Sequence, residues 1–390
     1  MRAVGHKNHS FNFHKALIHA RDFVLAFSKK NIVMLIACLC ATITCFFVPP
    51  DEKYLDYFDL KTLSCLFLVL AVVCALKNIR FFFTIARKIV EIFKNTRVCV
   101  LALLYITFIG SMLIANDMAL LTFLPLGYLV LKETGKEKYM AYTFIMQNIS
   151  ANLGGMLTPF GNPQNLYLYS KFEIPNLEFM GIMAPPFILS VVLITLCTLV
   201  FVKKEPITVT GDKVSLPPVR TTIYLLLFAL SIVVVFRGVP YFIALIIIPI
   251  VLLFMDRKAL LQVDYPLLLT FVFFFIFSGN MARIDEVRLL LEGFLQLDTM
   301  IASALSCQFI SNVPSAILLS QFTTDYKGLL LGVNIGGVGT LISSLASLIT
   351  LREYASHNPQ GVKSYIVKFS IFNFSFLAIL IGFMCLLRLF

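Results

Sequence analysis

The sequence contains no tryptophan and only five histidines, and charged residues occupy just 14% of its 390 positions. Soluble domains carry about 25% charged residues, so this scarcity excludes an ordinary soluble protein. The histidines lie outside the apolar stretches, and the nine cysteines lie within them without histidine at zinc-ligand spacing. We therefore expect the cysteines to be packing residues. We expect no disulfide scaffold, no histidine-based metal centre and no nucleic-acid partner.

Apolar residues are abundant instead: 59% of the chain is hydrophobic, with 38 phenylalanines. A membrane-spanning helix needs about 20 consecutive, mostly apolar residues. Nine stretches approach or exceed that length: 31–48, 60–77, 140–170, 179–202, 220–236, 239–255, 265–280, 328–351 and 369–387. The sequence therefore predicts an all-α polytopic membrane protein with about nine transmembrane helices, in contact with the lipid bilayer.

Two further apolar stretches, 98–131 and 299–322, are interrupted by polar residues at their centres, Asn116-Asp117 and Ser311-Asn312. Lysine and arginine flank the first stretch at both ends, whereas aspartate and glutamate flank the second. Cytoplasmic loops collect basic residues, so each stretch is expected to begin and end on one face of the membrane. We predict two re-entrant hairpins that enter from opposite faces.

With this topology, 24 of the 32 basic residues fall in cytoplasmic segments. This cytoplasmic excess of basic residues, rather than the formal net charge of +11 as such, orients the protein in a plasma (inner) membrane, with the N-terminus cytoplasmic and the C-terminus outside. Segments 79–95 and 283–297 each carry a polar and an apolar face. We interpret them as helices in the membrane interface just before each hairpin, or otherwise as ordinary connecting helices.

The chain also contains an internal repeat. Asn152-Leu-Gly-Gly155 matches Asn334-Ile-Gly-Gly337 at an offset of 182, and Ile114-Ala-Asn116 matches Ile310-Ser-Asn312 at an offset of 196. The predicted organisation is a cytoplasmic segment (1–30), a first repeat (31–202), a linker with an extra span (203–238) and a second repeat (239–390). The extra span inverts the second repeat, and inverted repeats with interrupted helices are typical of secondary transporters.

The repeated segments cannot be helical throughout, because Pro159, Pro163 and several glycines interrupt them. Non-helical backbone at membrane depth is tolerated where it is buried in protein or lines a watery cavity. Carbonyl, Asn, Ser and Thr oxygens suit a hard cation, and helix N-termini suit an anion. The alternative is close helix packing. The candidate binding residues are Asn116, Asp117, Asn152, Gly155, Thr158, Gly161, Asn162, Gln164, Asn165, Ser311, Asn312, Asn334, Gly337, Thr340, Ser343, Ser344 and Ser347.

Asp117 is the one carboxylate that this topology places deep in the membrane, where an ionisable group indicates function. It would bind a cation or take up a proton, or else only cap a helix beginning at Met118. An anion beside it would be repelled, so anion transport would need coupling to Na⁺ or H⁺. No organic cofactor is expected. The expected Na⁺ ligands are Asn116, Asp117, Asn162, Asn312 and Ser344.

These segments resemble the ion-transporter superfamily of citrate and dicarboxylate symporters, arsenite permeases and one class of Na⁺/H⁺ antiporters. The likeness covers most of residues 31–388 and is most specific at 116–121, 157–165 and 310–318. It is greatest toward bacterial inner-membrane permeases with citrate-transporter-like domains. The resemblance implies a homodimer with a scaffold part and a moving transport part, which work by an elevator-like motion.

Dicarboxylate symporters of this superfamily carry Ser-Asn-Thr at each hairpin tip. Here the tips read Ala115-Asn116-Asp117 and Ser311-Asn312-Val313, so only the asparagine is kept in both. The Ala-Asn-Asp tip is similar to the arsenite-permease pattern.

The leading hypothesis is a cation-coupled secondary transporter of a small anion or oxyanion, and the alternative is a Na⁺/H⁺ antiporter that uses Asp117. An intramembrane enzyme is not expected, because the sequence has no His-Glu-x-x-His motif and no second membrane carboxylate to pair with Asp117. A passive channel would use similar exposed carbonyls, and concentrative uptake would distinguish it from a transporter.

Overall fold

The computed structural model describes residues 31–207 and 215–387, so the predicted cytoplasmic segment 1–30 lies outside the described residues. The described ranges are helical and are joined by turns, with one isolated antiparallel bridge between Asn95 and Pro206. The described residues divide into two compact units, one of residues 31–58 with 264–283 and the other of residues 59–207, 215–263 and 284–387. The all-helical class expected from the sequence is confirmed.

The smaller unit contains α2 (Ile32–Phe47), the 3-10 helix η1 (Glu52–Tyr57) and α13 (Tyr265–Met281). Helix α13 packs along α2, and Asn280 Nδ2 donates a hydrogen bond to Thr44 Oγ1 at 3.2 Å. Arg283 binds both carboxylate oxygens of Asp51, at 2.9 and 2.6 Å. This bidentate pair ties the segment after α13 to the loop after α2.

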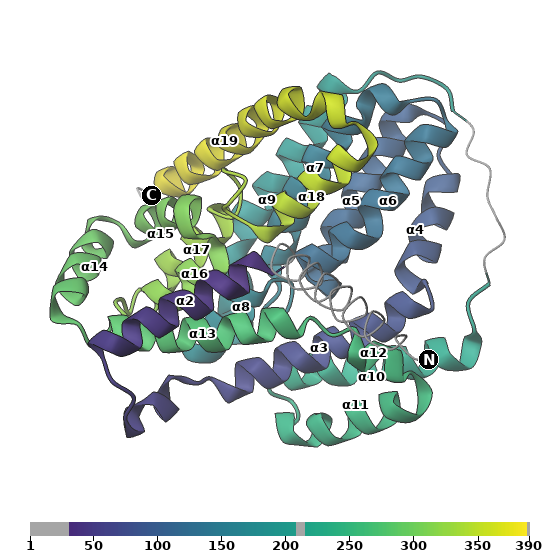
Figure 1. Ribbon diagram of the computed structural model, residues 1–390. Coiled ribbons are helices and arrows are strands. Elements are labelled where there is room, and N and C mark those ends of the chain that lie inside the picture. The colour runs from purple at the N-terminus through teal and green to yellow at the C-terminus, as the bar shows by residue number, and fades with distance from the viewer. Residues whose placement is uncertain (1–30, 208–214, 388–390) are drawn as a thin grey trace, which may run out of the picture. The chain divides into compact units, whose positions relative to one another are not determined.

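The larger unit contains the remaining helices, shown in Figure 1. They are α3 (Leu60–Asn78), α4 (Phe81–Glu91), α5 (Thr96–Ile114), α6 (Asn116–Glu133), η2 (Glu137–Tyr139), α7 (Met140–Gly154), η3 (Gly155–Leu157), α8 (Pro163–Lys171), α9 (Asn176–Phe201), α10 (Pro218–Val235), α11 (Tyr241–Met255), α12 (Arg257–Leu261), α14 (Asp285–Leu297), α15 (Thr299–Ile310), α16 (Asn312–Leu319), α17 (Tyr326–Ile335), α18 (Leu345–His357), η4 (Pro359–Gly361) and α19 (Val362–Leu387).

Within the described residues, six helical segments are long and apolar enough to cross a membrane. They are Leu60–Asn78, Thr96–Ile114, Asn176–Phe201, Pro218–Val235, Arg257–Met281 and Pro359–Leu387. A seventh is added if α14 and α15, which meet at a bend of 119°, count as one span. Four of the nine expected spans are absent from this set, because α2 and α11 have only 16 and 15 residues and because 140–170 and 328–351 are each broken. Thr96–Ile114, expected as a hairpin arm, is added.

Both predicted hairpin regions fold as pairs of helices that turn at the predicted tips. Ser306 Oγ and Ser315 Oγ hydrogen-bond across the α15–α16 pair at 3.0 Å. Helices α5 and α6 have 19 and 18 residues, whereas α15 and α16 have 12 and 8. At about 1.5 Å per residue, α5 is about 28 Å long and α15 about 18 Å. Helix α5, expected as a hairpin arm, is therefore long enough to cross the bilayer by itself.

The two broken spans exchange partners between the hairpins. Helix α7 packs against α5 and α6, but α8, the second half of the same predicted span, packs against α16 and α17. Conversely, α17 packs against α15 and α16, whereas α18 packs against α6 and α7. Figure 1 shows α18 beside α6 and α7. Each break therefore lies where the chain passes from one hairpin to the other.

A close helix approach recurs at equivalent places in both halves. A Cβ added to Gly154 in α7 would overlap the backbone carbonyl of Phe108, and one added to Gly336 would overlap the backbone of Ala304. These pairs are related by the offsets of 182 and 196 found in the sequence. Only glycine allows the broken spans to approach the hairpins this closely.

We expect Gly154→Ala to destabilise the protein by about 1–3 kcal/mol, because the added methyl group meets backbone that cannot rotate away. The measurement is the thermal unfolding midpoint in detergent. Gly293→Ala in α14 is the matched control, since its Cβ would meet nothing within 4 Å and alanine is the better helix former. Equal midpoints for Gly154→Ala and Gly293→Ala would contradict this packing.

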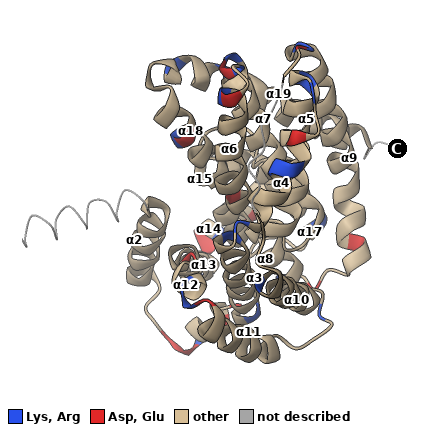
Figure 2. Cartoon of the chain, turned by 90° about the vertical axis from the view of Figure 1, so that its right-hand side faces the viewer, with Lys and Arg blue, Asp and Glu red and all other residues tan. Residues whose placement is uncertain are grey.

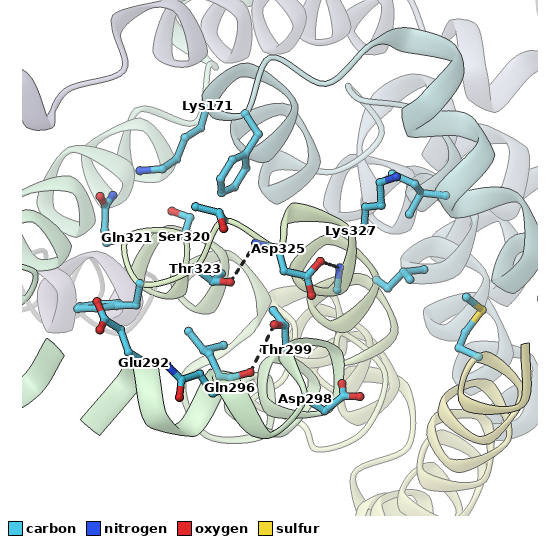
Figure 3. A pocket seen from close by; sticks show the side chains of 18 of the residues that line it. Lys171, Glu292, Gln296, Asp298, Thr299, Ser320, Gln321, Thr323, Asp325 and Lys327 are labelled. Carbon is cyan, nitrogen blue, oxygen red and sulfur yellow. Dashed lines mark hydrogen bonds between the residues drawn. The ribbon is translucent and has the colours of Figure 1, made fainter. Parts of the chain in front are cut away.

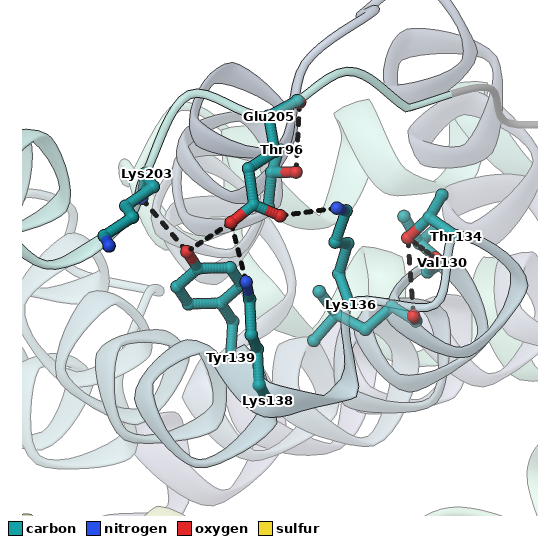
Figure 4. Close-up of polar contacts among 9 residues, drawn as sticks. Thr96, Val130, Thr134, Lys136, Lys138, Tyr139, Lys203 and Glu205 are labelled. Atoms are coloured by element: carbon teal, nitrogen blue, oxygen red, sulfur yellow. Dashed lines mark hydrogen bonds and ion pairs between the residues drawn. The ribbon is translucent and has the colours of Figure 1, made fainter.

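Charged residues lie mainly at helix ends and connections, as Figure 2 shows. One cluster joins three segments that the topology predicts to be cytoplasmic (Figure 4). Glu205, after α9, forms ion pairs with Lys136 and with Lys138 (2.6 Å) in the α6–α7 connection. Its backbone carbonyl accepts a hydrogen bond from the Thr96 N–H at 2.8 Å. The cluster therefore holds the base of the first hairpin at the end away from its tip.

Hydrogen bonds from Lys136 and Lys138 lower the pKa of Glu205 to about 2. A carboxyl whose pKa is lower in the folded state stabilises fully above its unfolded value, about 4.3, and progressively less below it. We expect Glu205→Gln to lower the unfolding midpoint by a constant amount between pH 5 and pH 8. The difference from the unmodified protein should shrink as the pH falls from about 4 toward about 2. A difference that grew on acidification would contradict this assignment.

Candidate functional site

Each hairpin turns at a strained residue followed by an asparagine. Ala115 has φ 65° and ψ 153°, and Ser311 has φ 72° and ψ 159°, a region in which glycine is the usual residue. Such a conformation costs about 1–3 kcal/mol and persists where the surrounding structure holds it. The side-chain oxygens of Asn116 and Asn312 each accept a hydrogen bond from the next backbone N–H at 2.9 Å. The two tips thus share one local design.

Buried amide side chains connect the first tip to both helix breaks. Asn116 Nδ2 donates to Asn152 Oδ1 at 3.2 Å, and Asn162 Nδ2 donates to Asn334 Oδ1 at 3.4 Å. Asn334 Nδ2 donates to Asn165 Oδ1 at 2.6 Å. Each of these side chains is at most 4% exposed. We call this network the amide junction, and its members are Asn116, Asn148, Asn152, Asn162, Gln164, Asn165 and Asn334.

The second hairpin tip reaches the same place. The Asn312 N–H donates to the Ser343 carbonyl at 2.9 Å, which joins the tip to the loop between α17 and α18. A Cβ on Gly337 in that loop would lie 3.1 Å from Asn312 Nδ2 and 3.6 Å from Asn152 Oδ1. Two hairpin tips and two helix breaks therefore meet at the amide junction.

Four helices begin at this meeting point, namely α6, α8, α16 and α18. Asn162 is the N-cap residue of α8, followed by Pro163 at the first helical position, where a missing N–H costs nothing. Ser344 Oγ accepts a hydrogen bond from the Ala346 N–H at the start of α18. Helix N-termini present N–H groups and a positive dipole end, which favour an anion nearby.

Two buried amide oxygens at the junction have no hydrogen-bond partner within the described residues. They are Asn162 Oδ1 and Gln164 Oε1, and each residue is 1% exposed. A buried acceptor left unpaired costs about 1–3 kcal/mol. Neutral amide oxygens are ligands that a hard cation accepts, so the residues present fit Na⁺ at this point.

Asp117 supplies the only charge among the predicted site residues. Helix α6 begins at Asn116 rather than at Met118, so Asp117 lies within its first turn and is half-buried. This corrects the alternative in which Asp117 precedes a helix beginning at Met118. A negative charge in the first turn of a helix interacts favourably with the helix dipole.

Other predicted site residues hold the loops in place. Thr158 Oγ1 donates to the Met112 carbonyl at 2.8 Å, and Thr340 Oγ1 donates to the Gln308 carbonyl at 3.0 Å. The two contacts are equivalent, because Thr158 and Thr340 are related by the offset of 182 and Met112 and Gln308 by the offset of 196. Each helix break is therefore attached to the first arm of the hairpin in its own repeat. Gly155 lies directly against the Asn162 side chain and Gly161.

The remaining predicted serines are hydrogen-bonded at the second break. Ser343 Oγ donates to the Gly337 carbonyl at 3.0 Å, and Ser311 Oγ donates to the Ser343 carbonyl at 3.3 Å. Ser347 Oγ accepts a hydrogen bond from Asn148 Nδ2 at 3.3 Å, which connects α18 to the amide junction.

Three buried polar residues near the junction are absent from the predicted set. Asn148 belongs to the junction itself, Asn373 in α19 accepts from Asn148 Nδ2 at 3.5 Å, and Gln308 donates to the Gly336 carbonyl at 2.9 Å. Each lies within an apolar stretch, which is the signal that could have identified them. Read singly, such amides indicate helix packing, so only the tertiary contacts assign them to the network.

A cavity of about 1240 Å³, lined by both polar and apolar residues, lies at the far end of α8 from its break (Figure 3). Lys171, Gln296, Thr299, Gln321 and Asp325 are among its lining residues, and no predicted site residue is. Ser320, which also lines it, hydrogen-bonds with Tyr167 of α8 at 2.9 Å. Helix α8 therefore extends from the amide junction to the wall of this cavity.

Known proteins resemble this chain over most of its length. Residues 23–325 match the family model described as citrate transporter. The chain belongs to the citrate transporter family. This confirms the resemblance seen in the sequence motifs. As a member of the citrate transporter family, the chain is a multi-pass membrane transporter and not an enzyme.

Two relatives of this citrate transporter family member cover most of its length. An uncharacterized transporter of Methanocaldococcus jannaschii is 35% identical over 294 residues, 75% of this chain and 80% of the relative. The inner membrane protein YbiR of Escherichia coli is 31% identical over 320 residues, 79% of this chain and 83% of the relative.

Proposed function

We propose that this protein is a secondary active transporter that moves a small anion or oxyanion coupled to Na⁺ or H⁺. The observation that carries the proposal is the meeting of two hairpin tips and two helix breaks at the amide junction. Four helix N-termini favour an anion there, while the unpaired oxygens of Asn162 and Gln164 favour a cation. Because Asp117 is negative and the junction amides are neutral, the anion needs a cation to enter with it.

We propose carboxylates and oxyanions as the substrate class. The family description points to carboxylates such as citrate. The tips keep only the asparagine of the Ser-Asn-Thr pattern, and the first tip is Ala-Asn-Asp, so arsenite-like oxyanions belong to the proposed class as well. Na⁺ is proposed to bind oxygens among Asn116, Asp117, Asn162, Asn312 and Ser344, together with the unpaired Oε1 of Gln164.

We propose nine membrane crossings and two re-entrant hairpins in inverted repeats, with the N-terminus cytoplasmic and the C-terminus outside. Two clusters support this orientation. Segments 94–97, 136–139 and 202–207, all predicted to be cytoplasmic, contact one another around Glu205. Residues 171–172, 292–299 and 320–328, all predicted near the outer face, line one cavity, which is proposed as the external vestibule.

The mechanism proposed is an elevator-type motion within a homodimer. The hairpins and broken spans exchange partners, so they are connected as one body that carries the junction. Substrate and coupling ion would bind together and neutralise each other's charge before that body moves through the bilayer.

The test is uptake into proteoliposomes of citrate, other carboxylates, sulfate, phosphate and arsenite under an imposed Na⁺ or H⁺ gradient. We expect accumulation of one solute above its equilibrium level under one gradient. Equilibration without accumulation would indicate a channel. Exchange of Na⁺ for H⁺ without any solute would favour the alternative function, a Na⁺/H⁺ antiporter in which Asp117 alternates between the two ions. That alternative is supported by the position of Asp117 beside Asn116.

A further inference from the structure

An apolar groove of about 450 Å³ runs between α4 and α5, away from the amide junction. Its walls include Phe82 and Ile85 of α4 and Ala102 of α5, and Phe123 of α6 also lines it. The hydroxyl of Tyr105, another lining residue, is hydrogen-bonded to Thr195 in α9. The volume falls within the range of about 300–1,000 Å³ typical of ligand sites. Such a lining accepts a hydrocarbon ligand.

The groove opens along exposed apolar side chains. Ile85 and Ile89 of α4 are 40% and 38% exposed, and Ile109 and Leu113 of α5 are 56% and 38% exposed. In a membrane transporter, such side chains face acyl chains rather than water. A lipid tail can therefore enter the groove from the bilayer without crossing a polar barrier.

The borders of the groove are strongly basic. Residues 77–97 contain six lysines and arginines and one acidic residue, Glu91, which is paired with Arg87 at 3.3 Å. Lys94 directly follows the lining residue Phe93, and Lys88 directly precedes the lining residue Ile89. Both lysines are exposed. Clusters of basic residues beside a membrane helix attract anionic lipid headgroups.

Helix α14, the counterpart of α4 before the second hairpin, lacks this charge. It exposes Leu289, Leu290 and Leu297 as α4 exposes isoleucines, but it carries Asp285 and Glu286 in its first turn. An apolar face on an interfacial helix is therefore common to both halves. The basic border is particular to α4.

We propose that the groove between α4 and α5 binds one anionic phospholipid, with an acyl chain against Phe82, Ala102 and Phe123 and the headgroup at Lys88 and Lys94. The acyl chain of the lipid would contact both arms of the first hairpin, because α5 and α6 both line the groove. Arg87 also binds Glu133 at the end of α6, at 3.4 Å. By contacting both α5 and α6, the bound lipid would stabilise the hairpin that carries Asn116. This inference is independent of which solute is transported.

Native mass spectrometry and thermal unfolding of the full chain in detergent test the proposal. Dioleoyl phosphatidylglycerol should remain bound and raise the unfolding midpoint by about 2–4 °C at saturation, whereas dioleoyl phosphatidylcholine should not. Free sn-glycerol 3-phosphate should also have no effect, because it lacks the acyl chain. Equal binding of the two lipids, or a shift caused by glycerol phosphate alone, would overturn the proposal.

Variants separate the headgroup site from the groove. Lys88→Gln with Lys94→Gln should weaken phosphatidylglycerol binding about 30-fold, from about 1 kcal/mol per basic residue. Lys363→Gln with Lys368→Gln removes the same charge from exposed positions on α19 and should leave binding unchanged. Ala102→Phe should fill the groove and abolish retention of the lipid. Unchanged binding in both Lys88→Gln with Lys94→Gln and Ala102→Phe would also overturn the proposal.

Discussion

Replacing Gln164 with methionine is expected to raise stability slightly while reducing ion-coupled transport by about 10- to 100-fold. The two side chains have similar shape, and Gln164 Oε1 is a buried oxygen without a hydrogen-bond partner in the described part of the chain. Its Nε2 makes a single long contact, 3.5 Å to Asn334 Oδ1. Removing an unsatisfied buried polar group relieves a cost of about 1–3 kcal/mol, whereas removing a cation ligand loses a comparable binding free energy.

Gln147→Met in α7 is the matched control. Gln147 is also fully buried and also has an unpartnered Oε1, but its Nε2 donates to Thr107 Oγ1 and to the Phe123 carbonyl, both at 3.0 Å. This variant should lose stability and keep its dependence on the coupling ion. Unfolding midpoints and the ion concentration for half-maximal uptake distinguish the two outcomes. Normal ion dependence in Gln164→Met would exclude this oxygen from the ion site.

Asp117→Asn is expected to abolish gradient-driven accumulation, a loss of more than about 100-fold, since a neutral amide cannot offset a cation's charge in the membrane. The substitution is nearly isosteric and keeps the start of α6 intact, because asparagine is tolerated in a first turn. Symport would leave solute exchange in the absence of a gradient, whereas antiport would lose all Na⁺/H⁺ exchange. Both activities are measured in proteoliposomes.

Asp59→Asn provides the control for charge removal at a helix start. Asp59 caps α3 by accepting a hydrogen bond from the Thr62 N–H at 2.9 Å, a role that asparagine fills equally well. Solute transport by the Asp59→Asn variant should remain coupled to the ion gradient. Retained transport that does not respond to pH in Asp117→Asn would remove both the symport and the antiport mechanisms.

The sequence predicted the local features of this site because they depend on nearby backbone chemistry. Pro159, Pro163 and the neighbouring glycines end α7 before α8 begins, and the two hairpins turn at the tip asparagines that the repeat matched. The family resemblance and the helical membrane class are also confirmed. The sequence could predict them because apolar length and short motifs are local properties. The proposed binding roles stay predictions.

Other features required the three-dimensional structure. The span count differed because α2 and α11 have only 16 and 15 residues, and because the stretches 140–170 and 328–351 are each broken. Asn148 and Asn373, read singly, indicate helix packing, and only the hydrogen bonds of Asn148 with Asn152 and Asn373 connect them to the junction. The cavity beside Lys171 is formed by segments far apart in sequence, so no local pattern identified it.

By itself, the sequence determined that this chain is an apolar membrane protein of a transporter family. It also showed an internal sequence repeat and helices interrupted by proline and glycine. It did so because hydrophobic length, prolines and glycines act over a few residues. Only the tertiary structure decided that the halves of each broken span pack against different hairpins. That exchange brings Asn162 against Asn334, 172 residues away, and creates the amide junction. Hydrogen bonds between such distant residues depend on how whole helices pack, and packing at close range is set by the entire set of neighbouring side chains.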